Sequence, residues 1–446
     1  MRSLRYLAAT GVLVLTLGAH ALERQPAAAY HARRVALAEK LQGGVAVLFA
    51  NEEPALEYQD WRQDEDFYYL TGWNEPGAAL VVEAPLAATA GHAARPYREV
   101  LMLPSRNLRM ELYTGVKLDA ATAGAAHKAG VDRVGPLAEL TAELNTRFAE
   151  DRHTLLWGEA SSEATAALAT LTASSIGSAK APSLLDVSAP IQELRSVKDA
   201  GEIALLRKAS DASVQAQFAM MRSIHPGQKE RVVEGILYAT LLANGCERPS
   251  YPSIVGSGIN STELHYSADE DTMQAGDVVV VDAAGEYSMY ASDITRTLPV
   301  SGHFTPRQRE IYDIVLGAQK AAMDAFVAGK SRIGDSYHED PNSLDTIAWK
   351  YMNAHGKDLH GEGLGRYFIH GIGHGVGIDV HDPFDRSKPI ERGQVFTIEP
   401  GIYIPEEKIG VRIEDVFYAS PDGKLIDLTE ALPKTADAVE AVVQGK

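Results

Sequence analysis

The chain has 446 residues, of which 45% are hydrophobic and 23% are charged. This length allows two or three domains of ordinary size with substantial apolar cores, and the composition excludes a disordered tail. The formal charge of -18, from 60 acidic against 42 basic residues, argues against a nucleic-acid groove or an anionic membrane surface as partner.

The first 21 residues have the pattern of a secretory signal peptide. Arg2 and Arg5 precede an apolar run from about Leu7 to Leu17, and Ala19-His20-Ala21 matches an A-x-A cleavage site. The run is short for a membrane span, so an uncleaved anchor is the lesser alternative. We expect an exported protein, periplasmic or secreted, with no stable membrane insertion after cleavage.

Residues 22–190 are expected to form a smaller α/β domain, because short apolar strands alternate there with helical stretches. The strands are predicted at 44–50, at 78–82, at 99–103 and from Leu155. Two alanine-rich stretches, 84–95 and 159–182, predict loops or surface helices and carry no chemistry.

Residues 191–446 are expected to form a second domain of the α+β class. Helices are predicted up to Met221, over 233–241 with an end at Asn244-Gly245, over 306–326 and around Trp349 and Met352. Strands are predicted at Val278–Asp282, Ile294–Leu298, Val376–His381, Val395–Glu399 and Val411–Val416. Because the elements are grouped rather than alternating, helices covering a curved, largely antiparallel sheet are favoured.

Cys246 is the only cysteine, so no intramolecular disulfide can form. It follows a predicted helix end and has no neighbouring histidine to activate it. We therefore interpret Cys246 as structural or inert.

Five potential metal ligands follow one another in the second domain, each on or beside a predicted strand: Asp282, Asp293, His374, Glu399 and Glu414. Four carboxylates and one imidazole could hold two divalent cations about 3.5 to 4 Å apart, with a water or hydroxide between them. The series indicates a two-metal hydrolase.

Asp282 ends a run of four valines, where an acid would not point inward without a partner. Ten residues, including the turn at Gly285, separate it from Asp293. This even number predicts that the two aspartates lie directly opposite each other on one face of a hairpin. Taken alone, the spacing also fits an ordinary turn or surface role.

Residues 370–381 contain three histidines, at positions 370, 374 and 381, and four glycines spaced two apart. Glycine at this density lets the backbone approach a ligand closely, while Val376, Ile378 and Val380 alternate as in a strand. A single histidine is more often a core or surface residue, but three in this setting indicate a site. Other histidines in polar helix or loop context receive no role: His338, His355 and His360.

Glu399 follows the apolar run 395–398 and precedes Pro400, which favours an extended and buried carboxylate. In the segment 411–414, the strand period places Arg412 and Glu414 on one face. A buried or edge ion pair between these two residues is the alternative to a ligand role for Glu414.

Together these residues resemble the creatinase, prolidase and methionine aminopeptidase family, and within it aminopeptidase P, whose catalytic domain has the pita-bread fold. The segment 253–258, followed by Leu264-His265-Tyr266, resembles the family segment that carries an active-site histidine. Residues 61–76 are similar to the N-terminal domain of aminopeptidase P. The resemblance is strong over 250–416 and patchy over 25–190.

The resemblance implies a smaller aminopeptidase-P-like domain over 22–190 and a pita-bread metallopeptidase domain over 191–446. The enzyme would release the N-terminal residue from peptides with proline in second position. It would use two divalent cations, Mn²⁺ first, with Zn²⁺ or Co²⁺ also compatible with hard oxygen ligands and one imidazole.

The resemblance also assigns roles to residues. The five ligands would be those named above, with Asp293 and Glu414 bridging and Glu399 exchanging protons with the bridging water. The residues around the substrate would be His265, His370, His381 and Arg412, with Tyr403 assisting.

The same family offers other functions. A prolidase restricted to dipeptides is favoured by the short interval between Glu399 and Glu414, whereas the N-terminal segment favours longer peptides. A metal-free pita-bread protein that only binds peptides, or a creatinase-like hydrolase, does not suit a chain with all five ligand positions. Methionine aminopeptidase does not suit the N-terminal domain and export signal. A homo-oligomer is common in the family.

Overall fold

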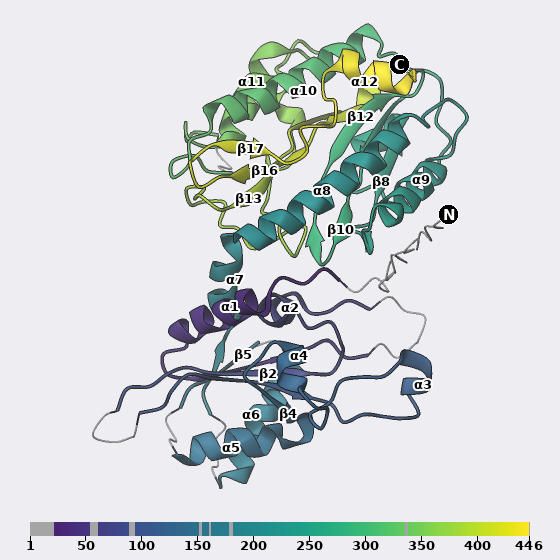
Figure 1. The fold of residues 1–446 in the computed structure, drawn as a ribbon. Helices are drawn as coiled ribbons and strands as arrows, with labels where there is room; N and C mark the ends of the chain where they lie inside the picture. The colour runs from purple at the N-terminus through teal and green to yellow at the C-terminus, as the bar shows by residue number, and fades with distance from the viewer. Residues whose placement is uncertain are drawn as a thin grey trace, which may run out of the picture.

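The computed structural model describes residues 22–53, 61–88, 94–150, 154–159, 162–177, 182–334 and 338–445. The predicted signal peptide, 1–21, lies outside these residues. Figure 1 shows two domains joined near helix α7 (Ser188–Ser196), with the N-terminal domain below the larger C-terminal one. The domain boundary predicted after residue 190 falls inside this helix. Within the described ranges, no helix is long and apolar enough to cross a bilayer.

The N-terminal domain is built on one six-stranded sheet in the order β4-β3-β2-β1-β5-β6. The central strands β1, β2 and β3 pair antiparallel, while β4, β5 and β6 add in parallel. Four of these strands confirm the predictions for this region: β1 (Val45–Phe49), β2 (Ala79–Glu83), β3 (Arg98–Leu103) and β5 (Leu156–Gly158). The edge strands β4 (Arg133–Pro136) and β6 (Leu184–Asp186) were not predicted.

Alternate side chains of this sheet enter two different cores. Val45 and Val47 face α5 (Leu140–Glu150) and α6 (Glu163–Ser175), which forms within the second alanine-rich stretch. Ala46 and Leu48 face the opposite side, where α1 (Ala27–Lys40) and α2 (Glu65–Thr71) pack. That second core also includes Leu205 and Leu206 of the C-terminal domain, so the two domains share buried apolar surface. The short helices α3 (Glu111–Thr114) and α4 (Ala125–Ala129) complete the domain.

The C-terminal domain places helices over strands that, wherever named strands pair, are antiparallel. All four predicted helices are confirmed: α8 (Ala200–Met221), α9 (Glu230–Ala243), α10 (Pro306–Ala325) and α11 (Leu344–His355). Capping boxes explain where two of these helices begin. Asp199 and Glu202 cap the N-terminus of α8, and Thr305 and Gln308 cap the N-terminus of α10. A last helix, α12 (Ala436–Val443), lies near the C-terminus.

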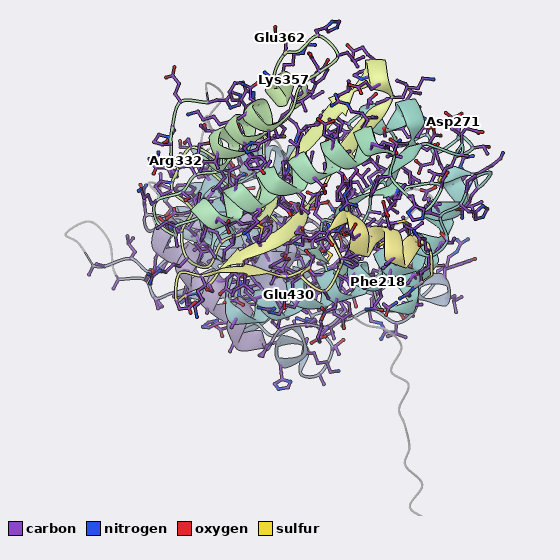
Figure 2. All side chains as sticks on the ribbon, turned by 90° about the horizontal axis from the view of Figure 1, so that it is seen from above. Phe218, Asp271, Arg332, Lys357, Glu362 and Glu430 are labelled. Atoms are coloured by element: carbon purple, nitrogen blue, oxygen red, sulfur yellow. The ribbon has the colours of Figure 1, made fainter. Side chains whose placement is uncertain are left out.

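The strands of this domain form small sheets in the orders β12-β9-β8, β11-β10-β7, β13-β16-β17 and β14-β15. Isolated bridges, Thr295 with Glu414 and Gly375 with Phe396, join them. Buried apolar residues of these helices and strands pack together in one core. The loop 356–363 lies outside that core, and Lys357 and Glu362 mark it at the outer edge of the domain (Figure 2). The predicted α+β architecture is therefore confirmed.

The predicted strand Val376–His381 is wrong. The segment is irregular, although Val376 and Ile378 are buried as a strand pattern requires. The chain folds back on itself, with the Asp382 amide donating to the Gly375 carbonyl at 3.0 Å and Gly377 donating to Asp379 at 2.9 Å. A Cβ at Gly377 would lie 2.5 Å from the Asp382 carboxyl group, so glycine is required for this tight return.

The predicted single strand Val411–Val416 is also wrong, because it is two strands. β15 (Ile409–Arg412) pairs with β14 (Gly401–Ile404), and β16 (Asp415–Ala419) pairs with β13 (Val395–Ile398). Between them, the Glu414 amide donates to Thr295 at 3.1 Å. The chain changes sheets at Glu414, and this change points the carboxylate at the neighbouring hairpin.

Candidate active site

A long hairpin carries the first two predicted ligands. It runs from β9 (Val278–Asp282) through β10 (Gly285–Tyr287) and β11 (Tyr290–Ala291) to β12 (Thr295–Pro299). Its tip is a two-residue turn with Ser288 at φ 51° and Met289 at φ 73°, as a type I′ turn requires.

The register of this hairpin corrects one prediction. Asp282 lies opposite Thr295, so Asp282 and Asp293 are not directly opposed but offset by two residues. Since residues two apart share a face of a strand, both carboxylates still point to the same side. The face was predicted correctly and the pairing was not.

All five predicted ligands line one cavity of about 640 Å³. Four of the predicted substrate-contacting residues line it too: His265, His370, His381 and Arg412. Tyr403 lies behind this wall, where its hydroxyl bonds His370 and Arg412. Residues from strands and loops far apart in the sequence therefore converge on one space.

His374 is oriented by its own neighbours. Its Nδ1 lies 3.1 Å from the Gly375 carbonyl oxygen, so Nδ1 carries the proton in that bond and Nε2 faces the carboxylates. Nε2 lies 3.3 Å from Asp293 and 3.4 Å from Glu399. One ligand atom each from Asp293, His374 and Glu414 lies within 4.8 Å of the others, which is close enough to share a cation.

The carboxylates of this cavity are buried beside one another. Burial raises the pKa of Glu414 well above its usual value, and the charges of Asp293, Glu399 and Asp282 raise it further. Burial likewise raises the pKa of Glu399 to about 7, with the neighbouring aspartates adding to the shift and His374 opposing it. Such a cluster carries more negative than positive charge, and divalent cations held by oxygen and imidazole donors would balance it. The residues present therefore fit a metal centre.

His374 responds to the same negative field, which favours the charged form of its imidazole. Burial disfavours the charged imidazole, but the hydrogen bond to Asp293 and the charge of Glu399 outweigh it and raise the pKa to about 9. The imidazole thus takes on part of the positive charge that these carboxylates need.

Arg412 pairs with Asp282 rather than with Glu414. Its Nη2 donates to Asp282 at 2.6 Å, and the Tyr251 hydroxyl donates to the other oxygen of Asp282 at 2.6 Å. Glu414 instead accepts a hydrogen bond from the Thr295 hydroxyl at 2.6 Å. The ion pair weighed as an alternative role for Glu414 is absent from the described contacts.

A hydrogen-bond chain runs from the Arg412 guanidinium into the histidine wall. Arg412 Nη1 donates to the Tyr403 hydroxyl at 2.8 Å, and that hydroxyl lies 2.9 Å from His370 Nε2. Burial and the nearby positive charge of Arg412 lower the pKa of His370 to about 4, so its ring is neutral and can accept from Tyr403. The chain fixes three predicted residues relative to Asp282.

Three residues that contact the ligands were missed: Tyr251, Thr295 and Thr397. Thr295 comes two residues after Asp293 and Thr397 two residues before Glu399, so the period of 2 of extended chain could have placed both threonines on the ligand face. Thr397 donates to Glu399 at 3.3 Å and accepts from the His374 amide at 3.1 Å. Nothing in the sequence around Tyr251 signals its contact with Asp282.

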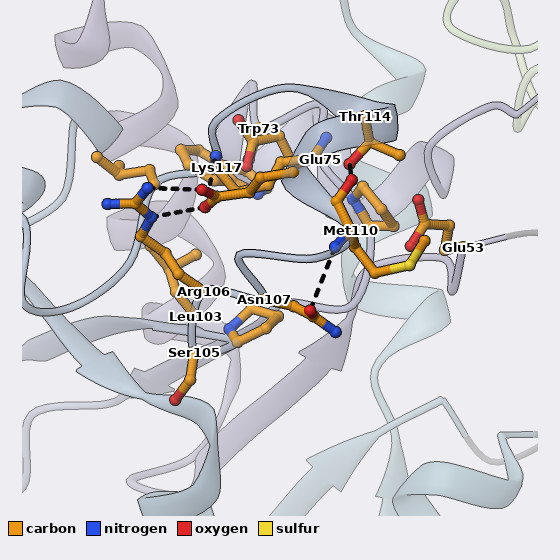
Figure 3. Close-up of a pocket in the computed structure, with 14 residues that line it drawn as sticks. Glu53, Trp73, Glu75, Leu103, Ser105, Arg106, Asn107, Met110, Thr114 and Lys117 are labelled. Carbon is orange, nitrogen blue, oxygen red and sulfur yellow. Dashed lines mark hydrogen bonds and ion pairs between the residues drawn. The ribbon is translucent and has the colours of Figure 1, made fainter.

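A smaller cavity, in the N-terminal domain, offers no comparable chemistry. Its volume is about 170 Å³. Residues of α3, of the loop before it and of the segment 73–76 line it (Figure 3). Arg106 and Glu111 pair with each other through two bonds of 2.6 Å, and Asn107 caps the turn at Met110. Among the described residues, no histidine, cysteine or aspartate lines this cavity.

His31, Glu99 and Asp132 form another cluster with metal-ligand side chains. Arg34, however, donates to both oxygens of Glu99, at 2.7 and 2.8 Å, and Tyr97 donates to one of them as well. A carboxylate so fully paired offers little to a cation, and this cluster is structural.

Cys246 is buried, and burial raises the pKa of its thiol to about 12. A thiol with so high a pKa is not a nucleophile near neutral pH. The interpretation of Cys246 as inert agrees with this environment.

Comparison with known proteins places both domains. Residues 204–421 match metallopeptidase family M24, and residues 30–157 match the N-terminal domain of aminopeptidase P. The chain is 35% identical over 441 residues to an Xaa-Pro aminopeptidase of Escherichia coli, covering 93% of this chain and 97% of that protein. It is 30% identical to an Xaa-Pro aminopeptidase of Haemophilus influenzae, with 94% and 98% covered.

Solved structures agree. A variant of E. coli aminopeptidase P in complex with substrate superposes with a TM-score of 0.82 at 30% identity, covering 95% of this chain and 99% of that one. Proline aminopeptidase P II from Yersinia pestis gives 0.80 at 31% identity, with 95% and 100% covered. A zinc-substituted E. coli aminopeptidase P in complex with product gives 0.82 at 30% identity, with 95% and 99% covered.

The dipeptidase resemblance is narrower. An Xaa-Pro dipeptidase of Pyrococcus furiosus is 37% identical over 238 residues, which covers 52% of this chain and 63% of that protein. The aminopeptidases match both domains over nearly their whole length. The chain therefore belongs to metallopeptidase family M24, as a hydrolase of the Xaa-Pro aminopeptidase type that uses divalent metal ions.

Proposed function

We propose that the protein is an exported exopeptidase with two metal ions that releases the N-terminal residue from peptides with proline in second position. The convergence of four carboxylates, four histidines and Arg412 on one cavity carries this proposal. Mn²⁺ is the proposed metal, with Zn²⁺ and Co²⁺ as alternatives that the same donors accommodate.

Asp282, Asp293, His374, Glu399 and Glu414 would hold the two ions, with Asp293 and Glu414 shared between them. Bound there, the two ions would activate water and polarise the scissile carbonyl. The geometry supports Asp293 and Glu414 as the shared pair, because both lie near His374 at the centre of the cluster.

The chain's own groups would bind and orient the peptide. We assign Glu399 the transfer of a proton from the attacking water to the leaving nitrogen, since its carboxyl group lies beside His374 on the cavity wall. His265, His370, His381 and Arg412 would surround the scissile carbonyl and the proline side, and Tyr403 would hold His370 in place. Arg412 also fixes Asp282, so one guanidinium serves both the ligand set and the substrate wall.

The test is an assay of purified protein on three substrates: an X-Pro dipeptide, a longer X-Pro peptide, and the same longer peptide with alanine replacing proline. We expect release of the first residue from both X-Pro substrates, more efficiently from the longer one, and little from the alanine control. Cleavage of the dipeptide alone would select the prolidase reading, and equal cleavage of the alanine control would reject proline specificity.

Metal dependence is tested on the same preparation. Chelation should abolish hydrolysis, and titration with Mn²⁺, Zn²⁺ and Co²⁺ should restore it as metal content approaches two ions per chain. Full activity at one ion per chain would reject the two-metal proposal.

Export rests on the charged, apolar and small-residue order of residues 1–21. Expression with a C-terminal tag, followed by fractionation and sequencing of the mature N-terminus, tests it. We expect a mature protein that begins at Leu22, outside the cytoplasm. An intact N-terminus in the cytoplasmic fraction would contradict export.

Self-association is also proposed. The segment around α3 exposes four large apolar side chains, between 65% and 85% accessible: Leu108, Leu112, Tyr113 and Val116. Exposed apolar patches of this kind commonly mark protein interfaces. Light scattering should give a mass above that of one chain, and a monomeric mass would contradict the proposal.

A further inference from the structure

The irregular segment 375–382 carries His381 without the support of a strand ladder. Within the segment, backbone bonds join Gly377 to Asp379 and Asp382 to Gly375, and the described contacts include no sheet pairing for His381 itself. The His381 ring lies against the His374 ring with centroids 4.2 Å apart. Its position therefore depends on what holds the residues on either side of it.

Arg195, in helix α7, holds both sides. Its Nη2 donates to Asp379 at 2.8 Å and to Asp382 at 2.6 Å, two residues before and one residue after His381. Its Nη1 donates to Asp66 of the N-terminal domain at 2.6 Å. Asp382 is completely buried and also accepts from Lys198 at 2.7 Å. Charge-assisted bonds of this kind, in a buried setting, fix geometry more strongly than neutral ones.

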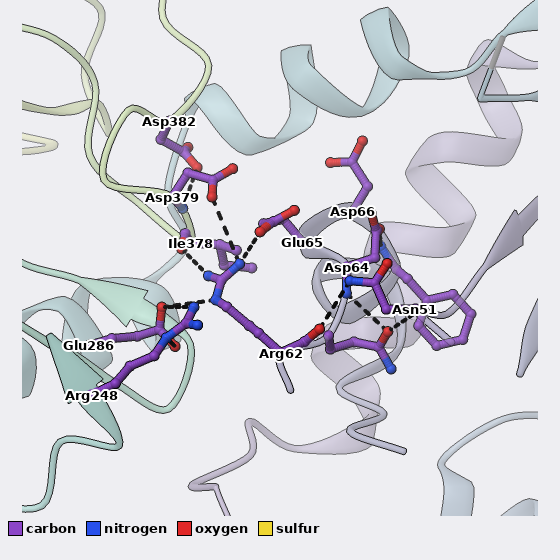
Figure 4. Close-up of polar contacts among 12 residues, drawn as sticks. Asn51, Arg62, Asp64, Glu65, Asp66, Arg248, Glu286, Ile378, Asp379 and Asp382 are labelled. Atoms are coloured by element: carbon purple, nitrogen blue, oxygen red, sulfur yellow. Dashed lines mark hydrogen bonds and ion pairs between the residues drawn. The ribbon is translucent and has the colours of Figure 1, made fainter. Parts of the chain in front are cut away.

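Arg62, in the N-terminal domain, adds a second support from another direction (Figure 4). Its Nη2 donates to the Ile378 carbonyl at 2.8 Å, three residues before His381. Its Nε donates to Glu286 at 2.9 Å, and Nη1 pairs with Glu65. Glu286 belongs to the hairpin between Asp282 and Asp293. One guanidinium thus joins the hairpin of two predicted ligands to the segment that carries His381.

The hairpin and the segment also meet directly. The Ala291 amide donates to the Gly377 carbonyl at 2.8 Å. This backbone contact fixes the start of the segment, whereas Arg62 and Arg195 fix the part next to the histidine. Neither arginine lines the cavity of the ligands. Arg195 does line a neighbouring cavity of about 950 Å³, together with Asp379 and His381.

We propose that Arg62 and Arg195 are positioning residues that set His381 relative to the ligand hairpin, so that the N-terminal domain shapes the substrate wall of the catalytic domain. The inference rests on the proposed function, because it takes His381 to contact the peptide. It explains why Arg62 reaches 316 positions along the chain to a backbone carbonyl. It also gives the N-terminal domain a part in hydrolysis besides its share of the common core.

The test is a double-mutant cycle between Arg62 and His381 in the full chain. Arg62→Met keeps the aliphatic stem and removes the donors, while Arg248 still pairs with Glu286 at 2.9 and 3.1 Å. We expect kcat/KM for a longer X-Pro peptide to fall about 10- to 100-fold, the cost of a misplaced contact group. In a His381→Ala background, Arg62→Met should cause less than about a twofold further loss, because the group it positions is gone.

Arg248→Met is the matched control. It also removes donors from Glu286 but has no described contact with 375–382. We expect its kcat/KM to stay within about twofold of the parent and its metal content to be unchanged. Arg195→Lys supplies a second arm, since one ammonium keeps the charge but cannot reproduce the planar fork that reaches Asp66, Asp379 and Asp382.

The outcomes distinguish failure of the positioning role from failure of the proposed function. Equal losses from Arg62→Met with and without His381, or a loss of bound metal in Arg62→Met, would overturn the positioning role. A similar loss in Arg248→Met would assign the effect to Glu286 instead. Failure of the unmodified enzyme to cleave X-Pro peptides, or full activity of His381→Ala, would reject the proposed function or the role of His381 rather than the arginine contacts.

Discussion

In the N-terminal domain, the two fully buried carboxylates of the described residues each meet an arginine, Glu83 with Arg147 at 2.8 Å and Glu99 with Arg34 at 2.7 Å. In the catalytic cavity, which Arg386 also lines, the described ion pairs of the four carboxylates involve one arginine, Arg412 beside Asp282, together with histidines such as His374. The charged groups of both regions are largely buried, but only in the first region does each buried carboxylate have an arginine partner.

This difference in charge balance distinguishes carboxylates with a structural role from carboxylates that can bind a ligand. A buried ion pair that is complete within the protein leaves no capacity for a ligand, whereas a buried cluster with excess negative charge is stable only if something else supplies positive charge. Burial raises the pKa values of Glu399 and Glu414, and the charges of the neighbouring carboxylates raise them further. The pKa of Glu99 moves the other way, because its bonds to Arg34 and Tyr97 outweigh burial and lower it.

The largest effect should come from Glu414→Gln in the cavity. We expect kcat/KM on an X-Pro peptide to fall about 10⁴-fold, which is about 5 kcal/mol of transition-state stabilisation, with loss of bound metal. Unfolding of the metal-free variant should need as much denaturant as the metal-free parent or more, because one of several mutually repelling carboxylates is gone. Strong destabilisation of the metal-free variant would show that Glu414 is structural, as Glu99 is.

The converse change in the N-terminal domain is Arg34→Met, which leaves Glu99 buried without its main partner. We expect the free energy of unfolding to fall by about 3 to 5 kcal/mol, measured by denaturant titration, while kcat/KM of the folded protein is retained. The double variant Arg34→Met with Glu99→Gln should recover part of the loss. No recovery would mean that Arg34 acts through its bonds to the Leu70 and Gly130 carbonyls instead.

The pH dependence of the metal-free protein should distinguish the two regions further. The pKa of Glu399 is raised from 4.5 to about 7, so the folded protein keeps a proton that the unfolded chain releases. Stability from this group therefore falls as pH rises from about 4.5 to about 7. We expect Glu399→Gln to flatten that decline, measured by denaturant unfolding of both metal-free proteins at several pH values. An equal slope in the two proteins would contradict the raised pKa.

Much of this site could be predicted because its ligands sit where local patterns are strong. Asp282 ends a valine run and Glu399 stands between an apolar strand and a proline, and both patterns are read within a few residues. The helices α8 and α10 were predicted for the same reason, since their caps and apolar periods are local.

The errors arose where distant contacts override the local pattern. Val376, Ile378 and Val380 alternate like a strand, but the return of Asp382 to Gly375 and the arginine bonds to Ile378, Asp379 and Asp382 hold an irregular turn. Glu414 lies between β15, which pairs with β14, and β16, which pairs with β13. The alternation of apolar and polar residues does not reveal this change of pairing partner. Arg62 and Tyr251 contact residues far along the chain, so neither carries a local signal.

The smallest effect should come from an exposed ion pair of the N-terminal domain. Arg106 and Glu111 make two bonds of 2.6 Å beside the small cavity of Figure 3, a geometry as good as that of the buried pairs. The Arg106 side chain is exposed, although that of Glu111 is largely covered, and solvent around the guanidinium screens the charges. Arg106→Gln should therefore leave both the melting temperature and kcat/KM unchanged within error. A loss of stability approaching that of Arg34→Met would mean that geometry rather than burial sets the strength of these ion pairs. The contrast between the paired carboxylates of the N-terminal domain and the excess negative charge of the cavity would then need another cause.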